Sequence, residues 1–330
     1  MKKLFLSLVA AIVAATATYA QSTLVATLSH GENVTMYYGT YALRDAHKAA
    51  VSGDVINLSG GAFQAVTITK AVTLRGSGID AQDPTFIVND FDINIPTTDT
   101  GRLSMEGIRC ANTVTLKGTL TNAYFLKCLF YEMDCNTVSS TNIKNAMLAD
   151  CKVTYKFFLY GNSSIQFVNS LVDGFANGSN NAAASFINCV IEGQYGGANY
   201  ISFSQLINCV IFGSSGYIPS SSVANNCVSV GYDYDIFQNT PSSTGCKTVK
   251  SYANIFKTFT DTYSDTETFE LTDAAKTKCL GTDGTQVGLY GGVLPYSSIP
   301  SYPQITKMNV ANKTTADGKL SVEIEVSAAQ

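Results

Sequence analysis

Two acidic residues stand at the same place in successive copies of a repeated phrase. Asp173 and Glu192 each lie three positions after the marker residue of the phrase, Ser170 or Cys189. Repeats of this kind stack, so we expect the two side chains on adjacent rungs, pointing outward, where each carboxylate opposes ionisation of the other. Such a pair suits the acid and base of glycosidic hydrolysis, or a calcium ligand set. The plainer interpretation is two solvated acids at a turn.

Aromatic residues extend this candidate site. Tyr232 and Tyr234 alternate with acids in Tyr232-Asp233-Tyr234-Asp235, a composition that can contact sugars by ring stacking. The same four residues would also suit a loop that closes a coil. With Phe212 from the third copy of the phrase, the candidate ligand-binding residues are Asp173, Glu192, Phe212, Tyr232 and Tyr234.

Residue counts disfavour most other catalytic chemistry. The two histidines, His30 and His47, lie outside the repeats, so no Ser/His/Asp or Cys/His site is expected. There is no C-x-x-C, and we predict no metal and no cofactor. No Lys or Arg between Lys156 and Lys247 could serve as the base of a lyase. Only the earlier repeats contain basic residues that could support lyase chemistry, and solvated ion pairs are the commoner role of such residues. They are Arg102, Arg109, Lys117, Lys127, Lys144, Lys152 and Lys156, beside the acids Glu106, Glu132 and Asp150.

The phrase itself recurs through the middle of the chain. Its clearest copies run from Phe167 to Gly174, Phe186 to Gly193 and Leu206 to Gly213, and a looser copy runs from Asn225 to Gly231. With Cys or Ser as the marker, the copies centre on residues 110, 128, 151, 170, 189, 209 and 227. Units this short, built of β-branched and aromatic runs broken by Asn and Gly, cannot bury an apolar face alone. Stacking them predicts a parallel β-helix with coils about 4.8 Å apart.

Stacking also predicts ladders of equivalent side chains. Asn suits a bend because it tolerates left-handed backbone and its amide can bond to the next rung. Inward cysteines on successive rungs have parallel side chains, which disfavours disulfides, so we expect buried free thiols. The predicted structural ladder is Asn169, Asn188, Asn208 and Asn226 at the bend with Cys189, Cys209 and Cys227 inside. Cys135, Cys246 and Cys279 are placed off the ladder, and their pairing is left open.

The beginning and end of the repeat region strengthen this picture. Tyr41 to Ala50 has the pattern of a short amphipathic helix, and strand-like runs follow at Gly53–Leu58, Gly60–Phe63, Val66–Ile68 and Val72–Gly78. A closing phrase runs from Asp283 to Gly292, before Pro295-Tyr296. Over residues 40 to 296 the chain resembles the pectin-lyase-like superfamily of secreted bacterial β-helix proteins. The resemblance implies an all-β, right-handed, single-stranded parallel β-helix with an N-terminal cap helix. It implies no activity, because this fold carries lyases, hydrolases and adhesins alike.

The first 20 residues have the pattern of a secretory signal peptide. Lys2 and Lys3 precede the apolar run Leu4 to Ala15, and a small-residue stretch ends at Ala20. The protein is therefore predicted to be exported, whether periplasmic, on the cell surface or extracellular. No later segment is long and apolar enough to cross a bilayer.

The sequence predicts four regions and two surfaces for self-association. The regions are the signal peptide (1–20), an N-terminal segment (21–39), the β-helix (40–296) and a linker with a C-terminal β-hairpin (297–330). A lone hairpin is barely stable in water, so it is expected to contact the solenoid or a partner. The second surface is a row of outward aliphatic residues, exposed unless something covers it: Leu171, Val190, Val210 and Val228.

Composition favours binding over catalysis and disfavours nucleic acid. Charged residues make up 14% of the chain, the net charge is −4, and Ser, Thr and Asn together supply 89 of the 330 residues. The leading interpretation is a non-catalytic exported surface protein that binds a glycan or a protein along the solenoid side. The alternatives are a polysaccharide-active hydrolase or lyase, and a structural surface or fibre subunit.

Overall fold

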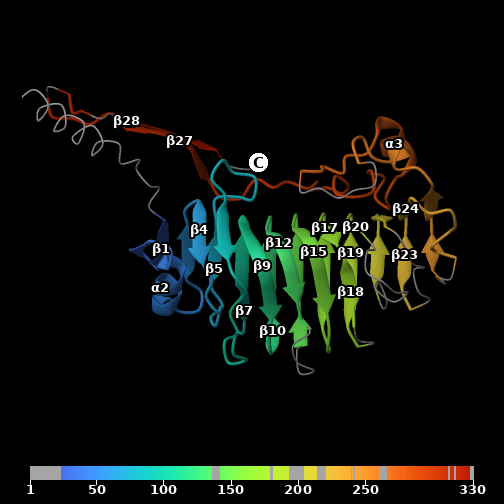
Figure 1. Ribbon diagram of the computed structural model, residues 1–330, viewed down its shortest axis with the longest axis horizontal. Coiled ribbons are helices and arrows are strands. Elements are labelled where there is room, and N and C mark those ends of the chain that lie inside the picture. Colours follow the sequence, from blue (N-terminus) through green and yellow to red (C-terminus); the bar gives the residue numbers. More distant parts are fainter. Residues whose placement is uncertain are drawn as a thin grey trace, which may run out of the picture.

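The strands of the chain stack into a parallel β-solenoid of about eight turns (Figure 1). The computed structural model describes residues 24–135, 142–178, 181–192, 204–213, 221–238, 240, 242–259, 266–310, 313–315 and 317–327. The predicted signal peptide lies outside these residues. The predicted all-β solenoid, with its cap helix and C-terminal hairpin, is confirmed.

Two long sheets form the walls of the solenoid. Sheet A contains, in spatial order, β2 (Asn33–Tyr38), β1 (Val25–His30), β3 (Val55–Leu58), β5 (Thr73–Arg75), β8 (Leu103–Glu106), β11 (Ala123–Leu126), β14 (Ala146–Ala149), β16 (Ser164–Val168), β19 (Ala183–Ile187), β21 (Gln205–Ile207), β23 (Val223–Asn225) and β25 (Ser243–Thr244). Sheet B contains β4 (Gly61–Gln64), β6 (Thr85–Val88), β9 (Ile108–Leu116), β12 (Leu129–Asp134), β15 (Lys152–Leu159), β17 (Leu171–Asp173), β20 (Val190–Glu192), β22 (Val210–Phe212), β24 (Val228–Val230) and β26 (Lys247–Val249). Four short strands flank the second sheet or pair apart from it: β7 (Phe91–Ile93) beside β9, β18 (Phe175–Asn177) beside β15, and β10 (Thr119–Thr121) with β13 (Asn142–Lys144).

A short helix closes the N-terminal end of the core. Helix α2 (Ala42–Ala49) lies where the cap helix was predicted, and its buried face is Ala42, Leu43 and Ala46. Before it, β1 pairs antiparallel with both β2 and β3, whereas the later coils pair in parallel. The apolar interior therefore starts under α2 and continues along the stacked inward side chains.

Each coil turns a corner between sheet A and sheet B through one residue with a positive φ angle. The predicted asparagines occupy this corner, with φ of 44° at Asn169, 52° at Asn188, 56° at Asn208 and 49° at Asn226. Lys127 and Asp150 hold the same place in earlier coils, with φ of 50° and 53°. The left-handed corner was thus anticipated from the residue type. For Asn169, Asn208 and Asn226 the predicted amide bond to the next rung is wrong, because these side chains bond to another part of the chain, described below.

Directly after the corner, the next residue of each coil points inward. The thiol of each ladder cysteine donates to the carbonyl oxygen two residues earlier, with a sulfur–oxygen distance of 3.3 Å at Cys151, Cys189, Cys209 and Cys227. All nine cysteines are free thiols. Burial raises the pKa of Cys209 and Cys227. Serine takes the same role at Ser170, whose hydroxyl donates to Val168 O at 2.8 Å.

Two register assignments made from the sequence need correction. Cys110 is not a marker, because it pairs with Phe130, two residues beyond Cys128. Cys246 does belong to the ladder, because Val228 pairs with Lys247 and the residues before them are Cys227 and Cys246. A thiol two positions away along a strand points to the same side, so residue type alone could not separate the two registers.

The predicted apolar stripe exists but is covered. Leu171, Val190, Val210 and Val228 are all buried, and they pack with apolar residues that follow the last coil: Ile255, Phe256, Phe259, Phe269, Leu271, Val287 and Leu289. The covering region contains the 3-10 turn η1 (Tyr252–Asn254) and helix α3 (Asp273–Lys278). The stripe is therefore an internal packing surface and does not serve as an oligomer contact.

Residues 279–302, here called the return segment, run back along the outside of the coils towards the N-terminal end (Figure 1). Asn226 donates its amide to Leu280 O at 3.0 Å, and Asn169 donates to Leu289 O and Gly291 O, both at 2.8 Å. Asn208 Oδ1 accepts the Thr282 N–H at 2.8 Å. The corner asparagines Asn169, Asn208 and Asn226 thus hold the return segment against the coils by hydrogen bonds.

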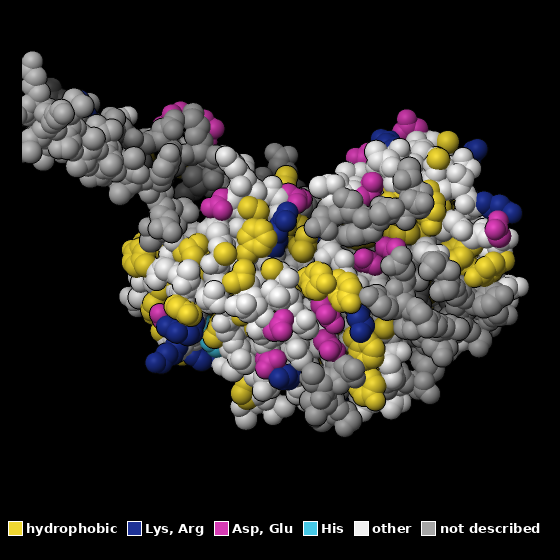
Figure 2. Space-filling view, viewed as in Figure 1, with side chains coloured by type: hydrophobic (Ala, Val, Ile, Leu, Met, Phe, Trp, Pro, Cys, Tyr) yellow, Lys and Arg dark blue, Asp and Glu magenta, His cyan; other side chains and the backbone are white. Residues whose placement is uncertain are grey.

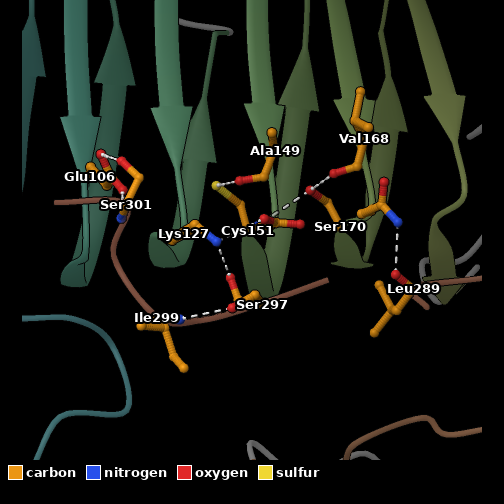
Figure 3. Close-up of polar contacts among 12 residues, drawn as sticks. Glu106, Lys127, Ala149, Cys151, Val168, Ser170, Leu289, Ser297, Ile299 and Ser301 are labelled. Carbon is orange, nitrogen blue, oxygen red and sulfur yellow. Dashed lines mark hydrogen bonds and ion pairs between the residues drawn. The ribbon is translucent and has the colours of Figure 1, made fainter. Parts of the chain in front are cut away.

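The earlier coils hold the rest of the return segment, as Figure 3 shows. Lys127 Nζ donates to Ser297 O at 2.8 Å and pairs with Asp150 at 3.1 Å. The buried carboxylate of Glu106 accepts the Ser301 N–H at 2.5 Å and the Ser301 hydroxyl at 3.0 Å. Beyond this point the chain forms the predicted hairpin of β27 (Gln304–Val310) and β28 (Val322–Ser327), in which every side chain of β28 is exposed.

Replacing Asn208 with Ala should lower the free energy of unfolding by about 1–3 kcal/mol, because the left-handed corner loses a tolerant residue and the Thr282 N–H loses its acceptor. Asn208→Gly keeps the left-handed backbone and removes only the amide, so its effect should be smaller. Urea denaturation followed by circular dichroism measures both variants against the wild type. Three equal stabilities would contradict the structural role of the corner asparagines.

Candidate functional site

A long groove of about 760 Å³ runs over the outer face of sheet A, across β11, β14, β16, β19, β21 and β23. We call it the lateral groove. Its floor is one outward column of residues that pair in register from rung to rung: Tyr124, Met147, Gln166, Ser185, Gln205 and Val223. Its remaining walls are Asn122, Asn145, Ala146, Ser164, Ile165, Ala183, Ala184, Ser204 and Ser221.

The lateral groove is polar without being charged. None of the described residues that line it is Asp, Glu, Lys, Arg or His. Gln166 and Gln205 make no side-chain hydrogen bond within the described part of the chain, so their amides are available to a ligand. Tyr124 lies at one end, with the Arg102 guanidinium 4.9 Å from its ring centroid. The groove therefore offers neutral donors and acceptors beside one aromatic ring.

The two predicted acids do face each other on adjacent strands of sheet B. Asp173 on β17 pairs in register with Glu192 on β20. Burial, then the neighbouring Glu192 charge, raises the pKa of Asp173 to about 8, and burial also raises the pKa of Glu192. With two acids this close, ionisation of one opposes ionisation of the other, so the pair holds a proton near neutral pH.

This pair is poorly placed for catalysis. Glu192 is only 4% exposed, and its Oε2 has no hydrogen-bond partner among the described residues. Glycosidases keep their two carboxyl groups about 5–5.5 Å apart, or about 6.5–9.5 Å apart, to admit a sugar or a water between them. A carboxyl group as buried as that of Glu192 does not admit a sugar or an attacking water beside it. The arrangement is a pair of neighbouring acids, one buried and one half-buried, that holds a proton.

The three predicted aromatic ligand contacts have different locations. Phe212 follows Glu192 in the same outward column but is buried among Tyr252, Phe256, Phe259 and Phe269. Its prediction as a ligand contact is wrong, because this cluster excludes a ligand from its ring. Tyr232 is also buried, packs in the main core and closes its C-terminal end with Ile236 and Phe237, which matches the alternative of a closing loop. Only Tyr234 is exposed, with its ring 5.8 Å from that of Tyr232.

The basic residues of the early coils are engaged with their own chain. Arg109 Nε donates to Ile79 O at 2.5 Å, and its guanidinium lies 3.3 Å from Asp80. Lys117 pairs with Asp92 at 2.7 Å. Glu106 is bonded to Ser301, so Arg109, Lys117 and Glu106, three of the residues that could have supported lyase chemistry, hold loops and the return segment in place.

Comparison with known proteins gives no assignment: no family model, no curated protein and no solved structure matches the chain. Within the described residues, no group of three or more His, Cys, Asp or Glu side chains is arranged to hold a metal ion. Among the helices of the described residues, none is long and apolar enough to cross a membrane.

Reasoning from the sequence missed the lateral groove. A signal for it exists, since its floor residue always lies three positions before the corner residue: Tyr124, Met147, Gln166, Ser185, Gln205 and Val223 precede Lys127, Asp150, Asn169, Asn188, Asn208 and Asn226. Gln and Ser at an outward position next to a buried aromatic indicate a solvent-facing polar column. The site predicted from the sequence rested on acidic and aromatic residues of other columns, and this column contains no acidic residue.

The carboxyl pair predicts a pH dependence of stability. Because the pKa of Asp173 is raised by folding from 3.8 to about 8, the folded state binds more protons than the unfolded state between those values. Stability should therefore fall as the pH rises from about 4 to about 8, and level off above it. Asp173→Asn should flatten this profile, measured by urea denaturation at each pH. Asp233→Asn, at an exposed position, is the control and should leave the slope unchanged.

Phe212→Ala tests the buried aromatic cluster. Removing a large ring from a packed cluster typically costs about 3–5 kcal/mol, so the free energy of unfolding should fall by roughly that amount. Tyr234→Ala, which removes an exposed ring, should change it by less than about 1 kcal/mol. A Phe212→Ala protein as stable as the wild type would return Phe212 to the list of surface contacts.

Proposed function

We propose that this chain is an exported protein that binds a neutral polysaccharide in the lateral groove and does not cleave it. The observation that carries the proposal is the groove floor, a column of uncharged side chains in which the Gln166 and Gln205 amides have no partner among the described residues. Export rests on the signal-peptide pattern of residues 1–20.

The chemistry of the groove matches that of sugars. Hydroxyl groups of a neutral sugar both donate and accept hydrogen bonds, as do amides and serine hydroxyls. The partly exposed Tyr124 ring offers an apolar face for the C–H groups of a sugar. A charged polymer would find no opposite charge among the described lining residues, and Arg102 stands only at the Tyr124 end, so a neutral chain is favoured over uronate polymers or nucleic acid.

The periodicity of the groove favours a polymer over a small molecule. Its floor repeats with the stacking of the strands, about 4.8 Å per rung, a spacing similar to the rise of one sugar unit in an extended chain. A polymer lying along the solenoid axis would meet a comparable set of side chains at each rung. Affinity then builds from several weak contacts of the same kind.

Binding without cleavage is supported by the arrangement of the acids. None of the described residues that line the lateral groove is a carboxylate, and the Asp173 and Glu192 pair lies on sheet B, where Glu192 is buried. General acid and base catalysis contributes factors of about 10²–10⁴ only when the group reaches the bond that breaks. A hydrolase or lyase is therefore the alternative, and a structural subunit without a glycan ligand is the third class.

A panel of soluble polysaccharides, scored for both binding and product release, tests the proposal. We expect a neutral polymer to bind the mature chain, and the double variant Gln166→Ala/Gln205→Ala to weaken it roughly tenfold or more, because two hydrogen bonds are lost. Gln238→Ala, an exposed glutamine outside the groove, is the matched control and should bind as the wild type does. No release of reducing ends or unsaturated products is expected.

Three outcomes would contradict the proposal. Binding that survives the double variant would place the ligand elsewhere on the solenoid. Product release that Asp173→Asn or Glu192→Gln abolishes would make the protein a hydrolase, and release that survives both would point to the early coils near Glu106 and Arg109. A protein that binds no polymer of the panel would favour the structural subunit or a protein partner.

A further inference from the structure

Strand β2 is an edge of the solenoid that nothing covers within the described residues. It is the first strand of sheet A, and it pairs only with β1, from Asn33 opposite His30 to Tyr38 opposite Val25. Its other edge presents backbone N–H and C=O groups without a strand partner in the described chain.

This edge lacks the features that normally prevent strand pairing. Natural edge strands are shortened or carry charges, prolines or bulges. Strand β2 has six residues, Asn-Val-Thr-Met-Tyr-Tyr, with no charge, no proline and no shift in its register with β1. Its outward side chains are apolar and exposed: Val34 by 60%, Met36 by 57% and Tyr38 by 61%. Helix α2 closes the apolar end of the core, and Tyr37 on the opposite face of β2 packs against that core, so the outward side chains of β2 are left without a partner in the described chain.

The opposite end of the solenoid is protected. The last strand of sheet A, β25, has only two residues. The last strand of sheet B, β26, begins at Lys247, whose Nζ donates to Lys278 O at 2.7 Å, and Lys250 follows it. A copy that docked head to tail would therefore place the open edge of β2 against a short, lysine-bearing end. The N-terminal end is therefore open to strand pairing and the other end is not, which favours a contact between the N-terminal ends of two copies.

We propose that two copies of this chain associate head to head, with β2 pairing antiparallel to β2 of the second copy. A twofold axis joins the same surface on both copies and closes after two chains, which a head-to-tail contact does not do. Because β2 has no charge, the pairing opposes no like charges. Sheet A then continues from one solenoid into the other.

The register follows from the outward side chains. With the axis at Met36, this residue lies opposite itself, and Val34 lies opposite Tyr38 of the second copy. All three apolar residues are then cross-strand neighbours, with Cβ atoms roughly 4.5–5.5 Å apart. The same register places Glu32 beyond the paired strand, opposite Thr40 of the second copy, so the two glutamates do not meet. Figure 2 shows hydrophobic side chains exposed at the end of the solenoid where β1 lies in Figure 1.

Light scattering coupled to size exclusion tests the association on the mature full-length chain. The wild type should elute with twice the mass of one chain, and Met36→Lys should elute as a monomer with an unchanged circular dichroism spectrum. Val293→Lys adds the same charge at a site that is 91% exposed and far along the chain, and it should remain a dimer. A monomeric wild type at every concentration, or a dimeric Met36→Lys protein, would overturn the proposal.

A disulfide cross-link tests the register directly, without a substitution that is meant to break the dimer. Met36→Cys should form a reducible disulfide-linked dimer on mild oxidation, because the two introduced thiols face each other across the axis. Val293→Cys should not cross-link. A wild-type dimer whose Met36→Cys variant does not cross-link would rule out this register. Loss of the dimer in Ile324→Lys but not in Met36→Lys would move the contact to the exposed hairpin β27–β28.

Discussion

The left-handed corner between sheet A and sheet B sets the geometry on which the other features depend. At this corner one residue of the coil adopts a positive φ angle, so the chain turns from sheet A to sheet B at the same place in successive repeats. Residues before the corner then face the lateral groove or the core in fixed alternation, and the residue after it always points inward. Asparagine meets the conformational demand at the lowest cost after glycine, and its amide is left free to bind another segment. The repeat in the sequence is therefore mainly a repeat of this corner.

The amino-acid sequence predicts what is local and periodic, and it misses what is distant. The coils, the corner asparagines and the inward thiols follow from the spacing of a few residue types. The return segment does not, because its contacts join residues 120 positions apart at Asn169 and Leu289, and 195 apart at Glu106 and Ser301. No periodicity connects them, although an outward row of four aliphatic residues does indicate that some cover is needed. The misassigned Cys110 and Cys246 have a related cause, since a degenerate repeat fixes the fold before it fixes the register.

The candidate site was also only partly predictable from the sequence, because residue type alone does not show which polar residues line a groove. Acids draw attention in a chain with few charges, and Asp173 and Glu192 do stack as predicted. Their burial and shared proton make them a local source of pH sensitivity, which is a different role from catalysis. The groove that could hold a ligand is made of glutamine, serine and asparagine, which are common throughout this chain. Only their position, three residues before each corner, distinguishes the ones that matter.

If the lateral groove binds the polymer proposed for it, the solenoid keeps the surface that stabilises the fold separate from the surface that binds. The face of sheet B at β17, β20, β22 and β24 is covered by apolar residues of the chain's own C-terminal region. Part of that region, the return segment, is hydrogen-bonded to corner asparagines. The outer face of sheet A stays open, and its side chains point away from the core. A substitution on the groove floor therefore changes the contacts offered to a ligand without creating a cavity or loosening the corner. A fold built in this way can alter its ligand one rung at a time, because the residues that hold the coils and the residues that would bind the polymer belong to separate columns.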